Sequence, residues 1–173
     1  MDFLRNLLIG TVGVIFFLGL FLPYAFALER KGNDSFIDDQ IREEVKKYLG
    51  VKYRRGGSSK RGVDCSGFVR LIYRNIFDVD LPYIAAYQYS LPIFKKVSLE
   101  KLRTGDLIFF SPNKKRINHV GIYLSGGRFA HALSKWGVII SNLENRYWKS
   151  RIYSTNRITT REVLDNHIRF GML

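Results

Sequence analysis

Cysteine is almost absent from this sequence, since Cys65 is the only one in 173 residues. A single thiol excludes an intramolecular disulfide framework, so Cys65 acts either through its own reactivity or through packing. Histidine is also scarce, with three residues, and 15 acidic residues stand against 28 Lys and Arg, which gives a formal net charge of +13. The sequence contains no internal repeat and no low-complexity tract, which argues against a repeat architecture.

The amino terminus carries an apolar run from Leu7 to Leu22, followed by Ala25-Phe26-Ala27. This small-x-small ending is typical of a cleavage site, so we expect residues 1–27 to be a signal peptide. The alternative is an uncleaved membrane anchor, because the apolar stretch extends to Leu28 and is then nearly long enough to cross a bilayer. Export would bring the chain into an oxidising space, where a cysteine without a partner stays available for chemistry.

The charge balance predicts an anionic partner. Removal of residues 1–27 takes away Asp2 and Arg5, one charge of each sign, so the exported part keeps its charge of +13. Anionic lipid, nucleic acid and an acidic cell-surface polymer all fit such a surface, and export argues against nucleic acid. The alternative is that the charge serves only solubility. The remaining length suits one domain, which we expect over 41–158, after a short leader at 28–40 and before a tail at 159–173.

Two helices are predicted by apolar spacing. From Phe36 to Leu49 the apolar residues recur at four-residue steps, and Gly50 ends the pattern. The stretch from Tyr53 to Gly62 is rich in glycine, serine and basic residues, and is expected to be a surface loop or one wall of a cleft. A second helix is expected from Cys65 to Phe77, with its apolar face buried.

The segment Asp64-Cys65-Ser66-Gly67 lies where that second helix begins. Asp64 is the natural N-cap, since its carboxylate can accept a backbone N–H of the first turn. A helix N-terminus favours negative charge, so this position is expected to lower the pKa of the Cys65 thiol. The alternative is a buried cysteine that packs as a small apolar residue.

A general base elsewhere in the chain would favour a reactive Cys65, and three histidines could supply one. His119 begins a strand-like stretch and His131 lies in the next one, with Ser125-Gly126-Gly127 between them as a hairpin loop. If Leu124 pairs with Arg128, the two histidines point to the same side of the sheet, whereas a two-residue loop would place them on opposite faces. Two converging histidines suit a base whose second nitrogen is held by a polar group. His167 shows no pattern around it and receives no role.

The order of elements predicts an α+β fold, with helices first and an antiparallel sheet after them. Asp106 follows Gly105 and is expected to be a turn residue. The expected strands are Leu107 to Phe110, His119 to Leu124, Arg128 to Leu133, Gly137 to Ser141 and Ile152 to Arg157.

Seven segments in one order carry a family resemblance: Tyr53-x-x-Gly56-Gly57, Asp64-Cys65-Ser66-Gly67-Phe68-Val69, Leu81-Pro82 with Gln88, Arg103 to Phe110, His119 to Tyr123, Phe129-Ala130-His131 and Gly137 to Ile140. Together they resemble the NlpC-type family of bacterial cell-wall cysteine endopeptidases. The resemblance covers about Tyr53 to Arg157. It implies a papain-like fold, in which N-terminal helices include the nucleophile helix, packed on an antiparallel sheet of about five strands.

The resemblance also implies roles for individual residues. Cys65 would be the nucleophile, His119 the general base, and His131 the residue that orients the imidazole. Tyr53 would assist the oxyanion or bind substrate, and Asp64 and Ser66 would line the substrate side of the cleft. No metal and no cofactor are implied.

The implied activity is cleavage of peptidoglycan stem peptides next to diaminopimelate, in the periplasm or cell envelope of a bacterium, by a chain expected to be a monomer. The anionic cell wall would be a further partner, and the membrane only if the N-terminal segment is not cleaved. The segment Tyr83-Ile84-Ala85-Ala86 departs from the family, which usually has a basic residue and small hydroxyl residues there. Two alternatives stay open: a cell-wall amidase or acyltransferase, and a wall-binding protein without catalysis.

Overall fold

The computed structural model describes residues 36–159, and the chain divides into two units at the boundary between Ile37 and Asp38. The expected signal peptide or anchor, and His167 in the tail, lie outside the described residues. Among the described helices none is long and apolar enough to cross a membrane. The expected domain limits of 41–158 stay a prediction.

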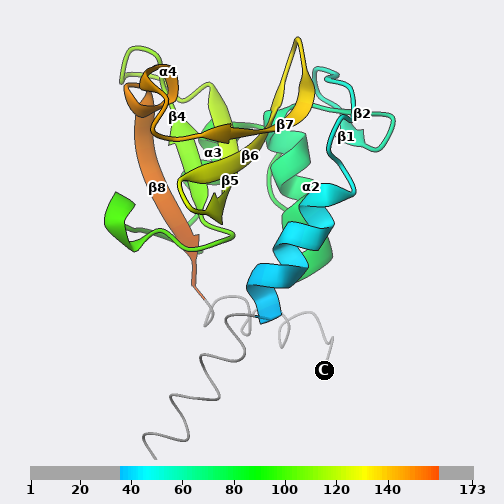
Figure 1. Ribbon diagram of the computed structural model, residues 1–173, viewed down its shortest axis with the longest axis horizontal. Coiled ribbons are helices and arrows are strands. Elements are labelled where there is room, and N and C mark those ends of the chain that lie inside the picture. Colours follow the sequence, from blue (N-terminus) through cyan, green and yellow to red (C-terminus); the bar gives the residue numbers. More distant parts are fainter. Residues whose placement is uncertain (1–35, 160–173) are drawn as a thin grey trace, which may run out of the picture. The chain divides into compact units, whose positions relative to one another are not determined.

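The described part is α+β, as predicted (Figure 1). A first helix covers residues 36–46 and gives way to a turn, so the expected extension to Leu49 is wrong by three residues. Gly50 follows with a φ of 78°, a conformation that glycine adopts without strain. The buried face of this helix presents Ile41 and Val45, as the four-residue spacing predicts.

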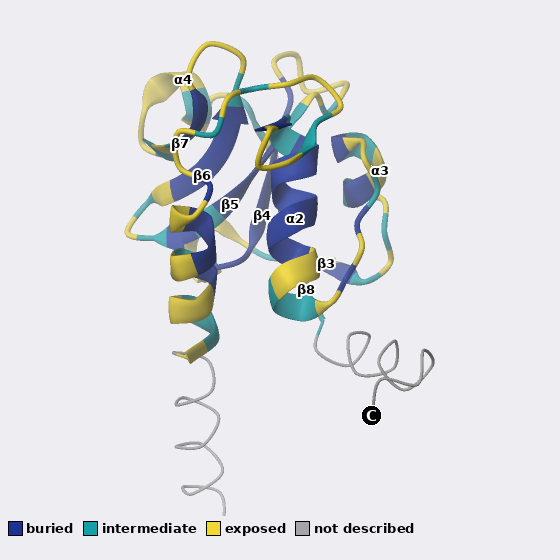
Figure 2. Ribbon diagram, turned by 90° about the vertical axis from the view of Figure 1, so that its right-hand side faces the viewer, coloured by how far each residue is buried: buried dark blue, intermediate teal, exposed yellow. Residues whose placement is uncertain are grey.

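The second helix, α2, spans Cys65–Phe77, the limits that the apolar spacing predicts. Most of it is buried, and the exposed residues Arg74 and Asn75 lie near its C-terminal end (Figure 2). The helix packs on the strands β5 (His119–Ser125) and β6 (Arg128–Leu133) of the main sheet. Phe68, Val69 and Ile72 supply the fully buried face.

The main sheet has six antiparallel strands rather than about five, in the order β3-β8-β4-β5-β6-β7. Beside β5 and β6, the expected strands are found as β4 (Leu107–Phe110), β7 (Gly137–Asn142) and β8 (Ile152–Ile158). The sixth is β3 (Phe94–Lys96), which pairs with β8. Only three residues long, it gives too short a pattern to read from the sequence.

Several short elements were also not predicted. The expected loop from Tyr53 to Gly62 contains a small hairpin, with β1 (Ser58–Ser59) paired to β2 (Gly62–Val63). The helices α3 (Ala85–Tyr89) and α4 (Arg146–Lys149) each make little more than one turn, and a 3-10 turn covers Leu99–Lys101.

Asp106 closes a turn, as predicted, by accepting the Arg103 backbone N–H at 2.8 Å. The Asp106 side chain also has a structural role beyond the turn. It is 2% exposed and accepts two hydrogen bonds of 2.8 Å from the Arg157 guanidinium. This bidentate ion pair joins the start of β4 to the end of β8. A buried carboxylate needs such a partner, since its charge would otherwise be costly to desolvate.

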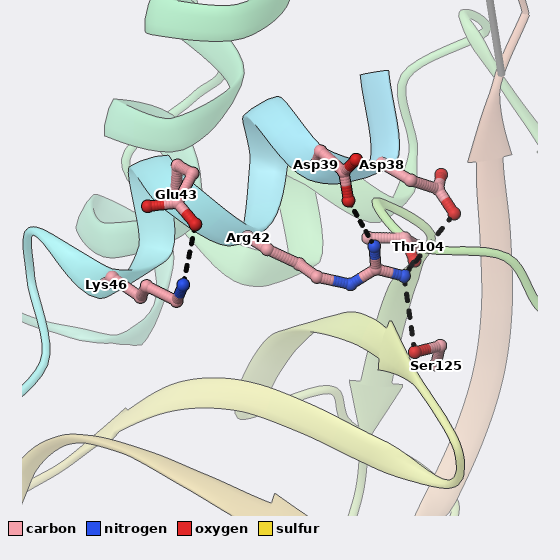
Figure 3. A network of polar contacts seen from close by, with 7 residues as sticks. All are labelled: Asp38, Asp39, Arg42, Glu43, Lys46, Thr104 and Ser125. Atoms are coloured by element: carbon pink, nitrogen blue, oxygen red, sulfur yellow. Dashed lines mark hydrogen bonds and ion pairs between the residues drawn. The ribbon is translucent and has the colours of Figure 1, made fainter. Parts of the chain in front are cut away.

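Arg42 of the first helix connects that helix to the sheet (Figure 3). Its guanidinium binds Asp39 at 2.9 Å and reaches the hydroxyls of Thr104 at 3.1 Å and Ser125 at 3.3 Å. Ser125 ends β5 with a φ of 82°, which is unusual for a residue with a side chain. The contact thus holds the end of the β5–β6 hairpin at the position where its backbone is strained.

Candidate active site

Cys65 is the first residue of α2, and the residue before it caps the helix. The Asp64 carboxylate accepts the Gly67 backbone N–H at 2.7 Å, which confirms the expected N-cap. Its other oxygen accepts the Gly56 backbone N–H at 2.8 Å. Asp64 therefore ties the preceding loop to the helix start that carries the thiol.

Gly67 makes this attachment possible. A Cβ atom at this position would lie 2.0 Å from the Gly57 carbonyl oxygen, so no larger residue fits without moving the backbone. Gly57 also accepts the Asp64 backbone N–H at 3.1 Å. The loop and the first turn of α2 thus pack backbone to backbone beside Cys65.

Ser66 points into the protein. Its residue is 4% exposed, and its hydroxyl donates to the Tyr83 carbonyl at 2.6 Å. Gln88 of α3 is fully buried and donates its side-chain amide to the carbonyls of Ser66 and Pro82, at 3.0 and 2.8 Å. The expected substrate-side residue thus has its hydroxyl engaged in holding the 82–88 segment against α2.

The Cys65 sulfur lies against the beginning of β5. The Val120 backbone N–H, which belongs to the peptide group that follows His119, lowers the pKa of the thiol and so lies close to the sulfur. The thiol therefore lies near the backbone that follows the first expected histidine, at the contact between α2 and β5.

The pKa of the Cys65 thiol differs from the expectation. Burial raises the pKa to about 11, and the Asp64 carboxylate adds to the rise. The N–H groups of Val120, Ser66 and Cys65 itself lower it, but by less. The predicted lowering at the helix N-terminus is therefore wrong for the resting protein, because desolvation of a thiolate outweighs the favourable dipole.

His119 and His131 meet side to side, as the strand parity predicts. His119 Nε2 and His131 Nδ1 are 2.9 Å apart. The hairpin reaches this arrangement by a different route, however, since Ser125 rather than Leu124 pairs with Arg128. The loop has two residues, and a bulge at Leu124 restores the expected pairing of Tyr123 with Phe129. Without the bulge, the two imidazoles would lie on opposite faces.

Aromatic rings surround the two imidazoles. Trp148 of α4 stacks on His119 with ring centroids 5.5 Å apart and meets His131 edge-on at 4.7 Å. Phe129 stacks on His131 at 4.5 Å, and Phe110 lies 5.7 Å from His119. Burial among these rings lowers the pKa of His119 to about 4 and that of His131 to about 3, with His119 adding to the second shift. Both imidazoles are therefore neutral at pH 7.

Two residues of the site were missed from the sequence. Ser141 of β7 lies with its Oγ 2.9 Å from His131 Nε2, so it continues the line of hydrogen bonds from His119. Trp148 lies in a stretch without a regular pattern of apolar residues, so the sequence alone does not single it out. Its only signal was an aromatic residue in a short segment between two strands.

Tyr53 lies near the thiol at the start of the basic loop and forms an isolated bridge with Val63. Burial raises the pKa of its hydroxyl, and the nearby groups of Cys65 and Asp64 raise it further. Tyr53 therefore stays protonated and keeps a hydrogen-bond donor beside Cys65.

Residues 50–157 match the NlpC/P60 family. The murein DD-endopeptidase MepS/murein LD-carboxypeptidase of Escherichia coli strain K12 is 40% identical over 125 residues, which are 72% of this chain and 65% of that protein. The probable endopeptidase NlpC of the same strain is 38% identical over 119 residues, 68% of this chain and 76% of that protein. This chain thus spans 65% of the length of the first of these relatives.

Solved structures give the same result for the fold. An NlpC/P60 family protein from Bacillus cereus superposes with a TM-score of 0.64 at 28% identity, over 70% of this chain and 40% of that one. The expected papain-like α+β architecture is thereby confirmed.

Proposed function

The chain belongs to the NlpC/P60 family, and on this premise we propose that it is a cysteine endopeptidase that hydrolyses peptide bonds of peptidoglycan. The observation that carries the proposal is the pair of imidazoles on β5 and β6, with His119 Nε2 and His131 Nδ1 2.9 Å apart, on the two strands against which the helix that begins at Cys65 packs. The printed names of the relatives, murein endopeptidases among them, support the substrate class.

Cys65 would be the nucleophile and His119 the general base. Because His119 Nε2 bonds His131, Nδ1 is the nitrogen left to serve the thiol. With a thiol pKa of about 11 and a His119 pKa of about 4, both groups are neutral in the resting enzyme over the range between. The thiol proton therefore passes to His119 as sulfur attacks the carbonyl, and not before.

The rest of the cycle returns this proton. His119 gives it to the leaving amine as the carbon–nitrogen bond breaks, which leaves an acyl group on the Cys65 sulfur. Water, with its proton accepted by His119, then hydrolyses the thioester and frees the thiol. His131 orients the imidazole throughout and accepts the N–H at Nε2 of His119.

Negative charge on the carbonyl oxygen needs donors during the attack. The backbone N–H of Cys65, at the start of α2, is one candidate donor, and the Tyr53 hydroxyl is the other. Asp64 contributes by fixing the helix start, and Ser66 by holding the 82–88 segment beside it.

We propose cleavage next to diaminopimelate in the stem peptide, in the bacterial envelope, by a chain exported through residues 1–27. The charge of +13 would hold the enzyme on an anionic wall.

Mass spectrometry of muropeptides, after incubation with the protein, tests the proposal. New amino termini within stem peptides are the expected product, and Cys65→Ser should yield none above background. Release of intact stems, or transfer of acyl groups, would instead identify an amidase or an acyltransferase and overturn the endopeptidase assignment. Binding to the wall without any product would identify a binding protein.

A further inference from the structure

We propose that Ser141 is a positioning residue that keeps the proton of His131 on Nε2, and thereby keeps His119 Nδ1 free to accept the Cys65 proton. The inference rests on the proposed function for its catalytic consequence. The position of the His131 proton in the resting protein can be measured without any substrate.

The geometry places Ser141 at the end of a line of three groups. His119 Nε2 and His131 Nδ1 are 2.9 Å apart, and His131 Nε2 and Ser141 Oγ are also 2.9 Å apart. Ser141 pairs with Phe129 across the β6–β7 ladder, two residues from the pairing of His131 with Ile139. Its side chain is therefore on the same face of the sheet as His131.

Each neutral imidazole carries one N–H and one bare nitrogen, so the line of hydrogen bonds has two possible directions. In one direction, His119 donates from Nε2 to His131, and His131 donates from Nε2 to Ser141. In the other direction, Ser141 donates to His131, and His131 donates from Nδ1 to His119. The second direction leaves the proton of His119 on Nδ1, the nitrogen that the proposed mechanism needs without a proton, and so blocks base catalysis.

The surroundings of Ser141 favour the first direction. His131 is fully buried, and the rings of Phe129 and Trp148 beside it offer no acceptor lone pair comparable to an oxygen. Ser141 is only partly buried, on β7 at the edge of the sheet. Its own O–H can therefore turn to solvent, which leaves an oxygen lone pair for the buried N–H of His131.

The variants Ser141→Ala and Ser141→Thr separate this role from packing. Alanine removes the acceptor and should lower kcat by about tenfold, the factor that corresponds to about 1.4 kcal/mol, with KM nearly unchanged because the proposed role acts through His131. Threonine keeps the hydroxyl and should restore most of the activity. Ser134→Ala, at an exposed position in the turn between β6 and β7, is the matched control and should behave as the wild type.

A nitrogen-15 NMR spectrum of the resting protein reads the proton position directly, with no substrate present. The wild type should show His131 protonated on Nε2 and bare on Nδ1, and Ser141→Ala should show a mixture of both forms. A wild-type His131 protonated on Nδ1 would overturn the inference, even if the alanine variant failed to fold. So would an unchanged tautomer with unchanged kcat in Ser141→Ala. If the wild type does not cleave peptidoglycan, the proposed function fails, while the NMR result still decides the role of Ser141.

Discussion

The indole of Trp148 stacks on the imidazole of His119, with ring centroids 5.5 Å apart and planes 26° apart. The same indole meets His131 edge-on at 4.7 Å. One side chain from a short helix therefore covers both histidines of the site. Because a charged imidazole is poorly solvated beneath it, the indole helps to keep both rings neutral.

Replacement of Trp148 by alanine should admit water to both rings and raise the pKa of His119 from about 4 toward its ordinary value near 6.5. His119 as the proposed base must be neutral to accept a proton, so activity should rise with pH through this pKa. The acid limb of kcat/KM should therefore move to higher pH in the variant, while Trp148→Phe should move it less. An acid limb at the same pH in wild type and Trp148→Ala would show that the indole does not set the pKa.

The raised pKa of the Cys65 thiol, about 11, predicts slow alkylation of the free protein near neutral pH. Since the thiolate is the reactive form, the rate with iodoacetamide should keep increasing about tenfold per pH unit through pH 9. The single cysteine makes the measurement unambiguous, and mass spectrometry gives the modified fraction. A plateau beginning below pH 7 would instead indicate a resting thiolate–imidazolium pair and would contradict the proton order proposed for catalysis.

Acid should destabilise the fold through the two histidines. Their folded-state pKa values, about 4 and about 3, lie below the unfolded value of about 6.5. The unfolded chain then binds more protons in that interval, so their contribution to stability is complete above pH 6.5 and is lost as pH falls toward 3. We expect a loss on the order of a few kcal/mol from urea unfolding between pH 7 and 4.

The matched variant for this measurement is His131→Gln, which keeps polar atoms but does not titrate. Its stability should depend less steeply on pH across the same interval. Equal slopes for the variant and the wild type would mean that burial of His131 does not drive the acid sensitivity.

Gly67→Ala should damage both stability and activity, because its Cβ would lie 2.0 Å from the Gly57 carbonyl oxygen. Relief of the overlap requires movement of the loop or of the first turn that carries Cys65. A cost on the order of 1–3 kcal/mol is expected for such overpacking. Arg74→Ala, at an exposed position of the same helix, is the control and should stay within about 0.5 kcal/mol of the wild type. A Gly67→Ala variant as stable and active as this control would exclude the close packing as a requirement.

Much of this fold is legible in the sequence where a pattern is long enough. The limits of α2 follow from apolar spacing over thirteen residues and from the Asp64 cap. The strands β4 and β6 likewise have their expected limits. The strand β3, with three residues, and the helix α4, with four, were not predicted. A segment this short is compatible with several kinds of secondary structure.

The site shows a similar division. The convergence of His119 and His131 follows from strand parity, but the bulge at Leu124 that secures it depends on a backbone conformation that no residue type announces. The pKa of Cys65 was predicted in the wrong direction, because a helix end is visible in the sequence and the depth of burial is not. Ser141 contacts His131 because β7 pairs with β6, and Trp148 contacts His119 from the short helix α4 that follows β7. Residue spacing in the sequence predicts neither contact.

The rate of stem-peptide cleavage by Cys65→Ala is the sharpest test of whether the Cys65 sulfur attacks the peptide bond. With isolated cross-linked muropeptides as substrate, we predict that kcat/KM falls by at least about 10³-fold, as removal of a nucleophile does in other hydrolases. Circular dichroism and a thermal melt would establish that the variant is folded. Cleavage by the folded Cys65→Ala protein at the wild-type rate would show that Cys65 is not the nucleophile.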